Sequence, residues 1–165
     1  PANRDMMNRK PIKKDEGIFT KGRTFRIIYQ GVMIGLLTLA GFIIGLATTH
    51  EPIDGLTLEQ SKVEVGQTMA FMVLAFSELV HVFSIRDNKN SVFKTGILGN
   101  KTLILAVLAS ALLMGVILVV PALRHVFSIP VLPMGNLLEV LGLVIAPLVI
   151  VEIMKLARVN TAKDE

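Results

Sequence analysis

The stretch that decides the fold is TMAFMVLAFSELVHVFS, residues 68–84. A helix from Gln67 to Arg86 would be roughly 28 Å long, which matches a hydrocarbon core of about 30 Å. Glu78 would lie about 12 Å from the Arg86 end of that helix. A charge at such depth costs about 2.5–3.5 kcal/mol and usually faces a protein interior or an ion path rather than lipid. The stretch therefore predicts a membrane helix that carries a functional carboxylate.

The composition points to a membrane protein. The chain has 165 residues, of which 52% are hydrophobic, and a mean hydropathy of +0.63. Its 17 Lys and Arg residues against 13 Asp and Glu give a net charge of +4, but these cations lie between long apolar blocks. The positive-inside rule explains such cations better than nucleic-acid binding does, and the chain has no Trp and only one Tyr to stack on bases. We therefore predict a lipid bilayer and no nucleic acid as a partner, and the lack of Cys excludes disulfides and thiolate metal sites.

Four apolar spans predict an all-α membrane fold. They cover about residues 27–48, 67–85, 102–120 and 136–154. Together they define a transmembrane domain over 27–158, preceded by a polar segment, 1–26, and followed by a tail, 159–165. Within the connections, residues 56–65 could form a short surface helix, and 121–135 are expected to be a short loop. Pro147 predicts a kink in the fourth span, because its ring removes a backbone hydrogen bond.

The basic residues predict the topology. All but two of the 17 Lys and Arg residues, namely Lys62 and Arg124, belong to the first segment, the 86–101 loop or the residues that follow the fourth span, from Lys155 onward. These three regions lie on one side if there are four spans. That side is expected to be cytoplasmic, so both termini are predicted inside. The chain begins at Pro1 without Met, which suggests a piece of a longer polypeptide; a processed or tagged product is the alternative.

Glycines in the first span offer two possible packing seams. Gly31 and Gly35 form one pair at four-residue spacing, and Gly41 and Gly45 form another. Small residues at this spacing let helix backbones approach closely in lipid. The pairs could serve two neighbouring helices, or they could reflect only the frequency of Gly in membrane helices.

Glu78 is the strongest candidate for chemistry. A carboxylate oxygen is a hard ligand, suited to Ca²⁺, Mg²⁺, Na⁺ or H⁺. Since Ca²⁺ takes about six to eight oxygens, one carboxylate supplies at most part of a site. The alternative is a protonated, hydrogen-bonded Glu78 that only holds helices together. His81, on the same predicted helical face, is expected to serve packing rather than metal binding.

The other polar residues of the spans have simpler explanations. Glu139, near the outer end of the fourth span, and Gln30, near the inner end of the first, are expected to reach interfacial water. Glu152 is expected to form a local ion pair with Lys155 three residues later. The sequence shows no Gly-rich phosphate loop, no His/Cys metal cluster and no Ser/His/Asp arrangement.

Several separated segments form a recognisable set by their order and spacing: DMMNRKP at 5–11 with GIF at 17–19, TMAF at 68–71, Glu78, HVFSIR at 81–86, NSVF at 90–93, GNK at 99–101 and EIMKLAR at 152–158. Together they resemble the C-terminal membrane region of P-type cation-transporting ATPases of the calcium-pump type. Lys10 departs from the family pattern, which has two consecutive prolines here: Lys10 replaces the first of them. The resemblance implies that the four spans are helices seven to ten of a ten-helix pump, and that Glu78 holds the position of a calcium-ligating carboxylate.

The resemblance also implies what this sequence lacks. The phosphorylated Asp, the nucleotide domain that uses ATP and Mg²⁺, and helices one to six would belong to the rest of the pump, so this chain alone should be inactive. The expected function is the C-terminal transmembrane portion of an ATP-driven Ca²⁺ pump in the plasma membrane. A pump for Na⁺ or another cation, and an independent four-helix structural subunit, are the alternatives.

Overall fold

The computed structural model describes residues 21–53, 55–85 and 100–156. Five helices make up these parts: α1 (Lys21–Thr48), α2 (Leu58–Ile85), α4 (Lys101–Val119), α5 (Pro121–Val126) and α6 (Met134–Leu156). All of them except α5 are long and apolar enough to cross a membrane. The predicted all-α fold with four spans is thereby confirmed. The predicted polar segment up to residue 20, the loop 86–99 and the tail from residue 157 lie outside the described residues.

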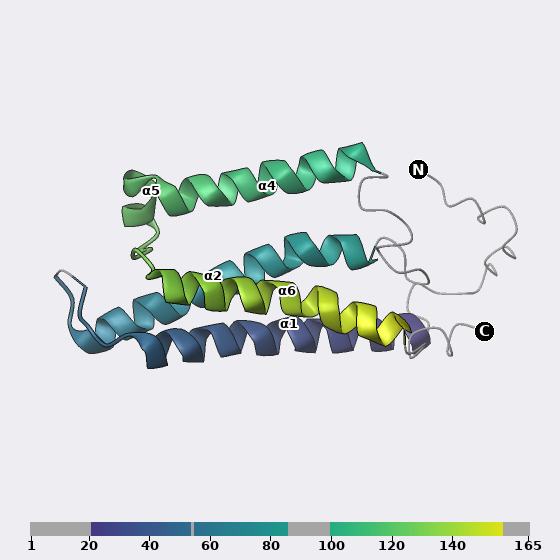
Figure 1. The fold of residues 1–165 in the computed structure, drawn as a ribbon, viewed down its shortest axis with the longest axis horizontal. Coiled ribbons are helices and arrows are strands. Elements are labelled where there is room, and N and C mark those ends of the chain that lie inside the picture. Colours follow the sequence, from purple (N-terminus) through teal and green to yellow (C-terminus); the bar gives the residue numbers. More distant parts are fainter. Residues whose placement is uncertain (1–20, 54, 86–99, 157–165) are drawn as a thin grey trace, which may run out of the picture.

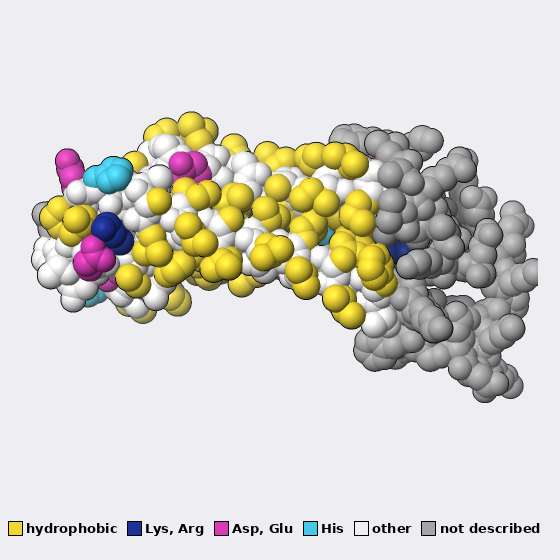
Figure 2. Space-filling model, turned by 90° about the horizontal axis from the view of Figure 1, so that it is seen from below, with side chains coloured by type: hydrophobic (Ala, Val, Ile, Leu, Met, Phe, Trp, Pro, Cys, Tyr) yellow, Lys and Arg dark blue, Asp and Glu magenta, His cyan; other side chains and the backbone are white. Residues whose placement is uncertain are grey.

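Three of the long helices form the packed core, and the fourth lies beside them. α1, α2 and α6 run against one another, while α4 lies to one side and α5 joins it to the start of α6 (Figure 1). The core is a cluster of apolar side chains drawn from α2, α6 and the residues before α6: Val65, Met69, Met72, Val73, Leu132, Val140 and Val144. No residue of α4 is buried. Hydrophobic side chains cover the length of the bundle, whereas most of the charged and His side chains in this view gather toward one end (Figure 2).

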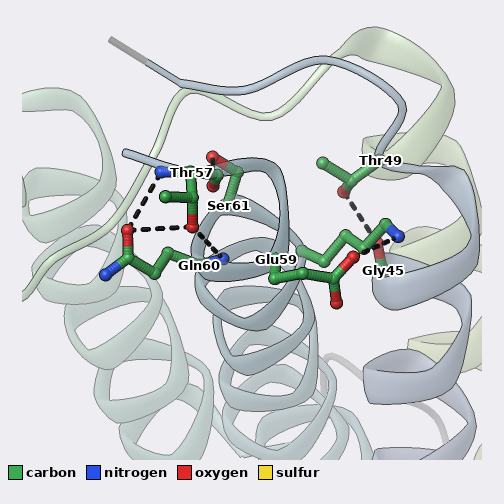
Figure 3. Close-up of polar contacts among 7 residues, drawn as sticks. Gly45, Thr49, Thr57, Glu59, Gln60 and Ser61 are labelled. Atoms are coloured by element: carbon green, nitrogen blue, oxygen red, sulfur yellow. Dashed lines mark hydrogen bonds and ion pairs between the residues drawn. The ribbon is translucent and has the colours of Figure 1, made fainter. Parts of the chain in front are cut away.

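The second membrane helix begins earlier than predicted. α2 starts at Leu58 rather than near residue 67, so residues 58–65 continue into the span instead of forming a separate surface helix. A capping box fixes this start (Figure 3). The backbone N–H of Gln60 donates to Thr57 Oγ1 at 3.3 Å, and the backbone N–H of Thr57 donates to the side-chain Oε1 of Gln60 at 2.9 Å. Glu59 in the first turn also suits the positive end of the helix dipole. Local capping therefore extends the helix through a polar stretch that hydrophobicity alone excluded from the span.

The fourth span tolerates its proline. α6 continues through Pro147, whose side chain is fully buried. Five of the buried positions of α6 follow one stripe of three- and four-residue steps: Asn136, Val140, Val144, Pro147 and Val151. This stripe lies against α2 and α1, so the proline belongs to the packed face rather than to the lipid-facing side.

Candidate functional site

Glu78 lies on the side of α2 that the packed core leaves uncovered. The exposed residues of α2 include one continuous stripe at helical spacing: Gln60, Val63, Gln67, Phe71, Leu74 and Glu78. The opposite face carries Met69 and Val73, both 0% exposed. The carboxylate therefore lies in the last third of α2, seven residues before the helix ends at Ile85, and is not enclosed by α1 or α6.

The neighbours of Glu78 on the same helix are buried. Ser77 is fully buried and His81 nearly so. Glu78 and His81 are neighbours one helical turn apart, as predicted, but His81 is buried while Glu78 is exposed. Within the described part of the chain, Ser77 Oγ and His81 Nδ1 have no hydrogen-bond partner. His81 thus belongs to the packed core, in keeping with its predicted packing role.

A glycine seam sets how α2 sits against α1. A Cβ atom built on Gly45 would lie 2.6 Å from Gly66 Cα, and one on Gly66 would lie 2.9 Å from the Phe42 carbonyl oxygen. Real Cβ atoms do not approach so closely, so the backbones can touch here only because both residues are Gly. Gly41 belongs to the same seam, with Val73 Cγ2 at 3.0 Å from its built Cβ. The seam fixes the spacing of the two helices and so the direction in which Glu78 points.

Among the described residues, only one of the two predicted glycine pairs packs against another helix. Gly41 and Gly45 form the seam, whereas a Cβ atom on Gly31 or Gly35 would meet nothing within 4 Å. Gly31 and Gly35 therefore make no close helix contact with the described residues. The sequence spacing could not distinguish them, because both pairs have the same four-residue step.

Asn136 links three helices at the end where α1 finishes and α6 begins. Its Nδ2 donates to Thr48 Oγ1 of α1 at 2.6 Å and to Met69 Sδ of α2 at 3.1 Å. Asn136 is 6% exposed and Met69 is 0% exposed. The sequence analysis missed Asn136, although an amide in the first turn of an otherwise apolar span is a detectable signal. Its contacts fix the register of α6 against both partners.

The remaining polar candidates fall at the ends of the bundle. Lys155 Nζ lies 3.0 Å from Glu152 Oε1, with both side chains buried, which confirms the predicted pair. Gln30 donates to the Tyr29 hydroxyl at 3.4 Å and is half-buried. Glu139 is half-buried, and its Oε2 is buried with no partner among the described residues; its contact with interfacial water stays a prediction. In that same part of the chain, no three His, Cys, Asp or Glu side chains come together as a metal site.

The chain matches a known family of membrane proteins over nearly its whole length. Residues 1–157 match the family described as "Cation transporting ATPase, C-terminus". The chain belongs to this family. The resemblance stated from the sequence motifs is thereby confirmed, and the chain is an integral, multi-pass membrane protein of the cation-transporting ATPases.

Several cation-transporting ATPases are similar to this chain. "Calcium-transporting ATPase 1" of Bacillus cereus is 38% identical over 97% of the chain, and "Calcium-transporting ATPase" of Bacillus subtilis is 34% identical over 87%. "Calcium-transporting ATPase type 2C member 1" of Pongo abelii is 29% identical over 94%. The chain spans only 15–18% of the length of these relatives. The chain is therefore one part, the C-terminal region, of a cation-transporting ATPase.

Proposed function

We propose that this chain is the C-terminal membrane portion of an ATP-driven P-type pump that transports Ca²⁺, and that Glu78 supplies one ligand of the ion. The observation that supports this most is the exposed position of Glu78 within the membrane-spanning part of α2, seven residues before the helix ends at Ile85. A carboxylate facing lipid at that depth would cost about 2.5–3.5 kcal/mol. A carboxylate facing the rest of a pump would instead find polar groups and an ion.

The size of the chain fits a partial site. Ca²⁺ needs about six to eight oxygen ligands, so Glu78 requires further ligands from other helices. The relatives are roughly six times longer than the stretch matched here, since the chain covers 18% of one and 15% of another. The remaining ligands, together with the groups that use ATP and Mg²⁺, would come from that remainder. The four spans would then be helices seven to ten, with the polar segment 1–26 and the tail 159–165 flanking the domain 27–158.

A stabilising role within this chain has less support. The alternative prediction was that Glu78 only holds helices together through hydrogen bonds. Such a residue should be enclosed by the helices that it joins, as Asn136 is. Glu78 is exposed instead, while the adjacent Ser77 is fully buried. The three-helix core therefore forms without enclosing Glu78.

Removing the charge of Glu78 in the full-length pump should weaken the apparent Ca²⁺ affinity at least tenfold, or about 1.4 kcal/mol. Glu78→Gln keeps the shape and one carbonyl oxygen, and Glu78→Ala should lower the affinity further. The measurement is Ca²⁺-dependent ATP hydrolysis as a function of free Ca²⁺. Glu64→Gln is the matched control, because it removes the same charge on the same helix about 21 Å away. Unchanged Ca²⁺ affinity in both Glu78 variants would defeat the ligand assignment, and activation by Na⁺ instead of Ca²⁺ would favour the alternative pump.

The orientation in the membrane is part of this proposal. With both termini cytoplasmic in the plasma membrane, the loop 86–99 lies inside and residues 49–57 lie outside. The chain has no native Cys, so only other parts of the pump need Cys replacement. A single Cys at Glu51 should react with an impermeant thiol reagent in intact cells, whereas one at Ser91 should react only after lysis. The reverse labelling pattern would invert the proposed topology.

A further inference from the structure

The connection between α4 and α6 is a closed structure rather than a loose loop. We call residues 120–133 the α5 hairpin. The Ile129 amide donates to the Arg124 carbonyl at 2.9 Å, and Arg124 Nε donates back to the Ile129 carbonyl at 3.2 Å. Ser128 adopts the left-handed backbone conformation, with φ of 51°, and its amide donates to the His125 carbonyl. These bonds hold the side chains of the α5 hairpin in fixed directions.

The α5 hairpin has one buried side and one exposed apolar side. Ile129 is buried, and Leu132 belongs to the core cluster with Val140 and Met69. On the other side, Val126 is 73% exposed, Phe127 57% and Val131 75%. Three large apolar side chains at such exposure within six residues form a patch that is unusual on a surface facing water. The inward residues fix the α5 hairpin, so the apolar patch cannot turn inward to bury itself.

The charge of the α5 hairpin distinguishes it from the other connection at the same end of the bundle. No Asp or Glu occurs between Lys101 and Glu139, and the hairpin carries Arg124 and His125. The connection between α1 and α2 lies at that same end (Figure 1). It is acidic, with Glu51 and Asp54 followed by Glu59 in the first turn of α2. Lipid phosphates would attract the α5 hairpin and repel the α1–α2 connection.

We propose that the α5 hairpin is a membrane-interface anchor. Val126, Phe127 and Val131 would enter the boundary between headgroups and acyl chains, at a depth of about 5–10 Å. Arg124, whose Nε is used within the hairpin, would present the rest of its guanidinium to the lipid phosphates. The partner is the bilayer itself, because the hairpin directly continues α4, which has a hydropathy of 2.8 and buries no residue against protein. This inference depends on the spans alone and not on the role of Glu78.

The test places a fluorescent reporter on the exposed side of the α5 hairpin. The chain has no Trp, so Phe127→Trp adds one indole whose emission is read as the difference from the parent full-length pump. The pump is reconstituted in phosphatidylcholine vesicles in which the lipids carry bromine either near the headgroup or near the chain end. Glu51→Trp, on the acidic connection at the same end, is the matched control. Val131→Trp is a second reporter in case the first variant does not fold.

The proposal expects blue-shifted emission from Phe127→Trp and stronger quenching by bromine near the headgroup than near the chain end. Glu51→Trp should emit as in water and respond to aqueous iodide instead. Two results would overturn the anchor. Iodide quenching equal to that of the control would place the patch in water. An indole reached by neither iodide nor brominated lipid would mean that another part of the pump covers it.

Discussion

Gly45→Ala is expected to destabilise the bundle by about 1–3 kcal/mol, the usual cost of overpacking. The added methyl group would sit 2.6 Å from Gly66 Cα and 3.1 Å from Met69 Sδ. The nearest atoms are backbone atoms, which cannot rotate away, so α1 and α2 must separate. Gly45→Leu should have a larger effect. Thermal unfolding of the 165-residue chain in detergent, followed by circular dichroism, measures the change.

Gly31→Ala is the control for Gly45→Ala, because it makes the same change in the same helix. Its methyl group would meet nothing within 4 Å. Ala is favoured over Gly inside a helix by about 1 kcal/mol, so the control should be neutral or slightly stabilising. Gly45→Ala is thus expected to lower the stability, whereas Gly31→Ala should leave it unchanged or raise it slightly. Equal losses of stability would show that the seam between Gly45 and Gly66 does not carry the packing.

Met69→Ala is expected to cost about 2–5 kcal/mol, the range for emptying a fully buried site. Met69 is 0% exposed, belongs to the core cluster and accepts a hydrogen bond from Asn136 through its sulfur atom. The substitution therefore removes packing among three helices and one contact of the Asn136 amide. The same unfolding measurement applies.

Met114→Ala provides the comparison for Met69→Ala. Met114 lies on α4, which has no buried residue, so the same truncation leaves no enclosed cavity there. We expect a change well below that of Met69→Ala. A loss at Met114 as large as that at Met69 would mean that α4 is packed as tightly as α2, against the described structure.

The number and type of the long helices could be predicted because the signal is strong. Runs of about 20 apolar residues admit few structures other than membrane helices. The early start of α2 could not be predicted from hydrophobicity, because its first turns are polar and are held by the Thr57–Gln60 capping box. The short helix α5 was missed for a related reason: it begins at Pro121, which favours a first helical turn but also occurs in loops.

The sequence identifies Glu78 as the candidate residue but does not predict which residues surround it. A carboxylate within an apolar run can be recognised from the sequence alone. Its exposure depends on how α2 is rotated against α1, which the contacts of Gly45 and Gly66 determine in three dimensions. The same rotation decides that His81 is buried. The Asn136 contacts join residues 67 and 88 positions apart, and no local pattern reports such pairs. The ligand role of Glu78 and the orientation of the spans stay predictions.

The order of packing has a consequence for biosynthesis. α6 is the last of these helices to be translated, yet it completes the core with α1 and α2, whereas α4 precedes it and buries nothing. While the ribosome is making α4, the faces of α1 and α2 that receive Asn136, Val140 and Val144 have no partner. The nascent chain must therefore hold α1 and α2 in an incomplete arrangement until α6 leaves the translocon. During that interval the uncovered faces of α1 and α2 would be accessible to the membrane proteases and chaperones that recognise incompletely packed helices.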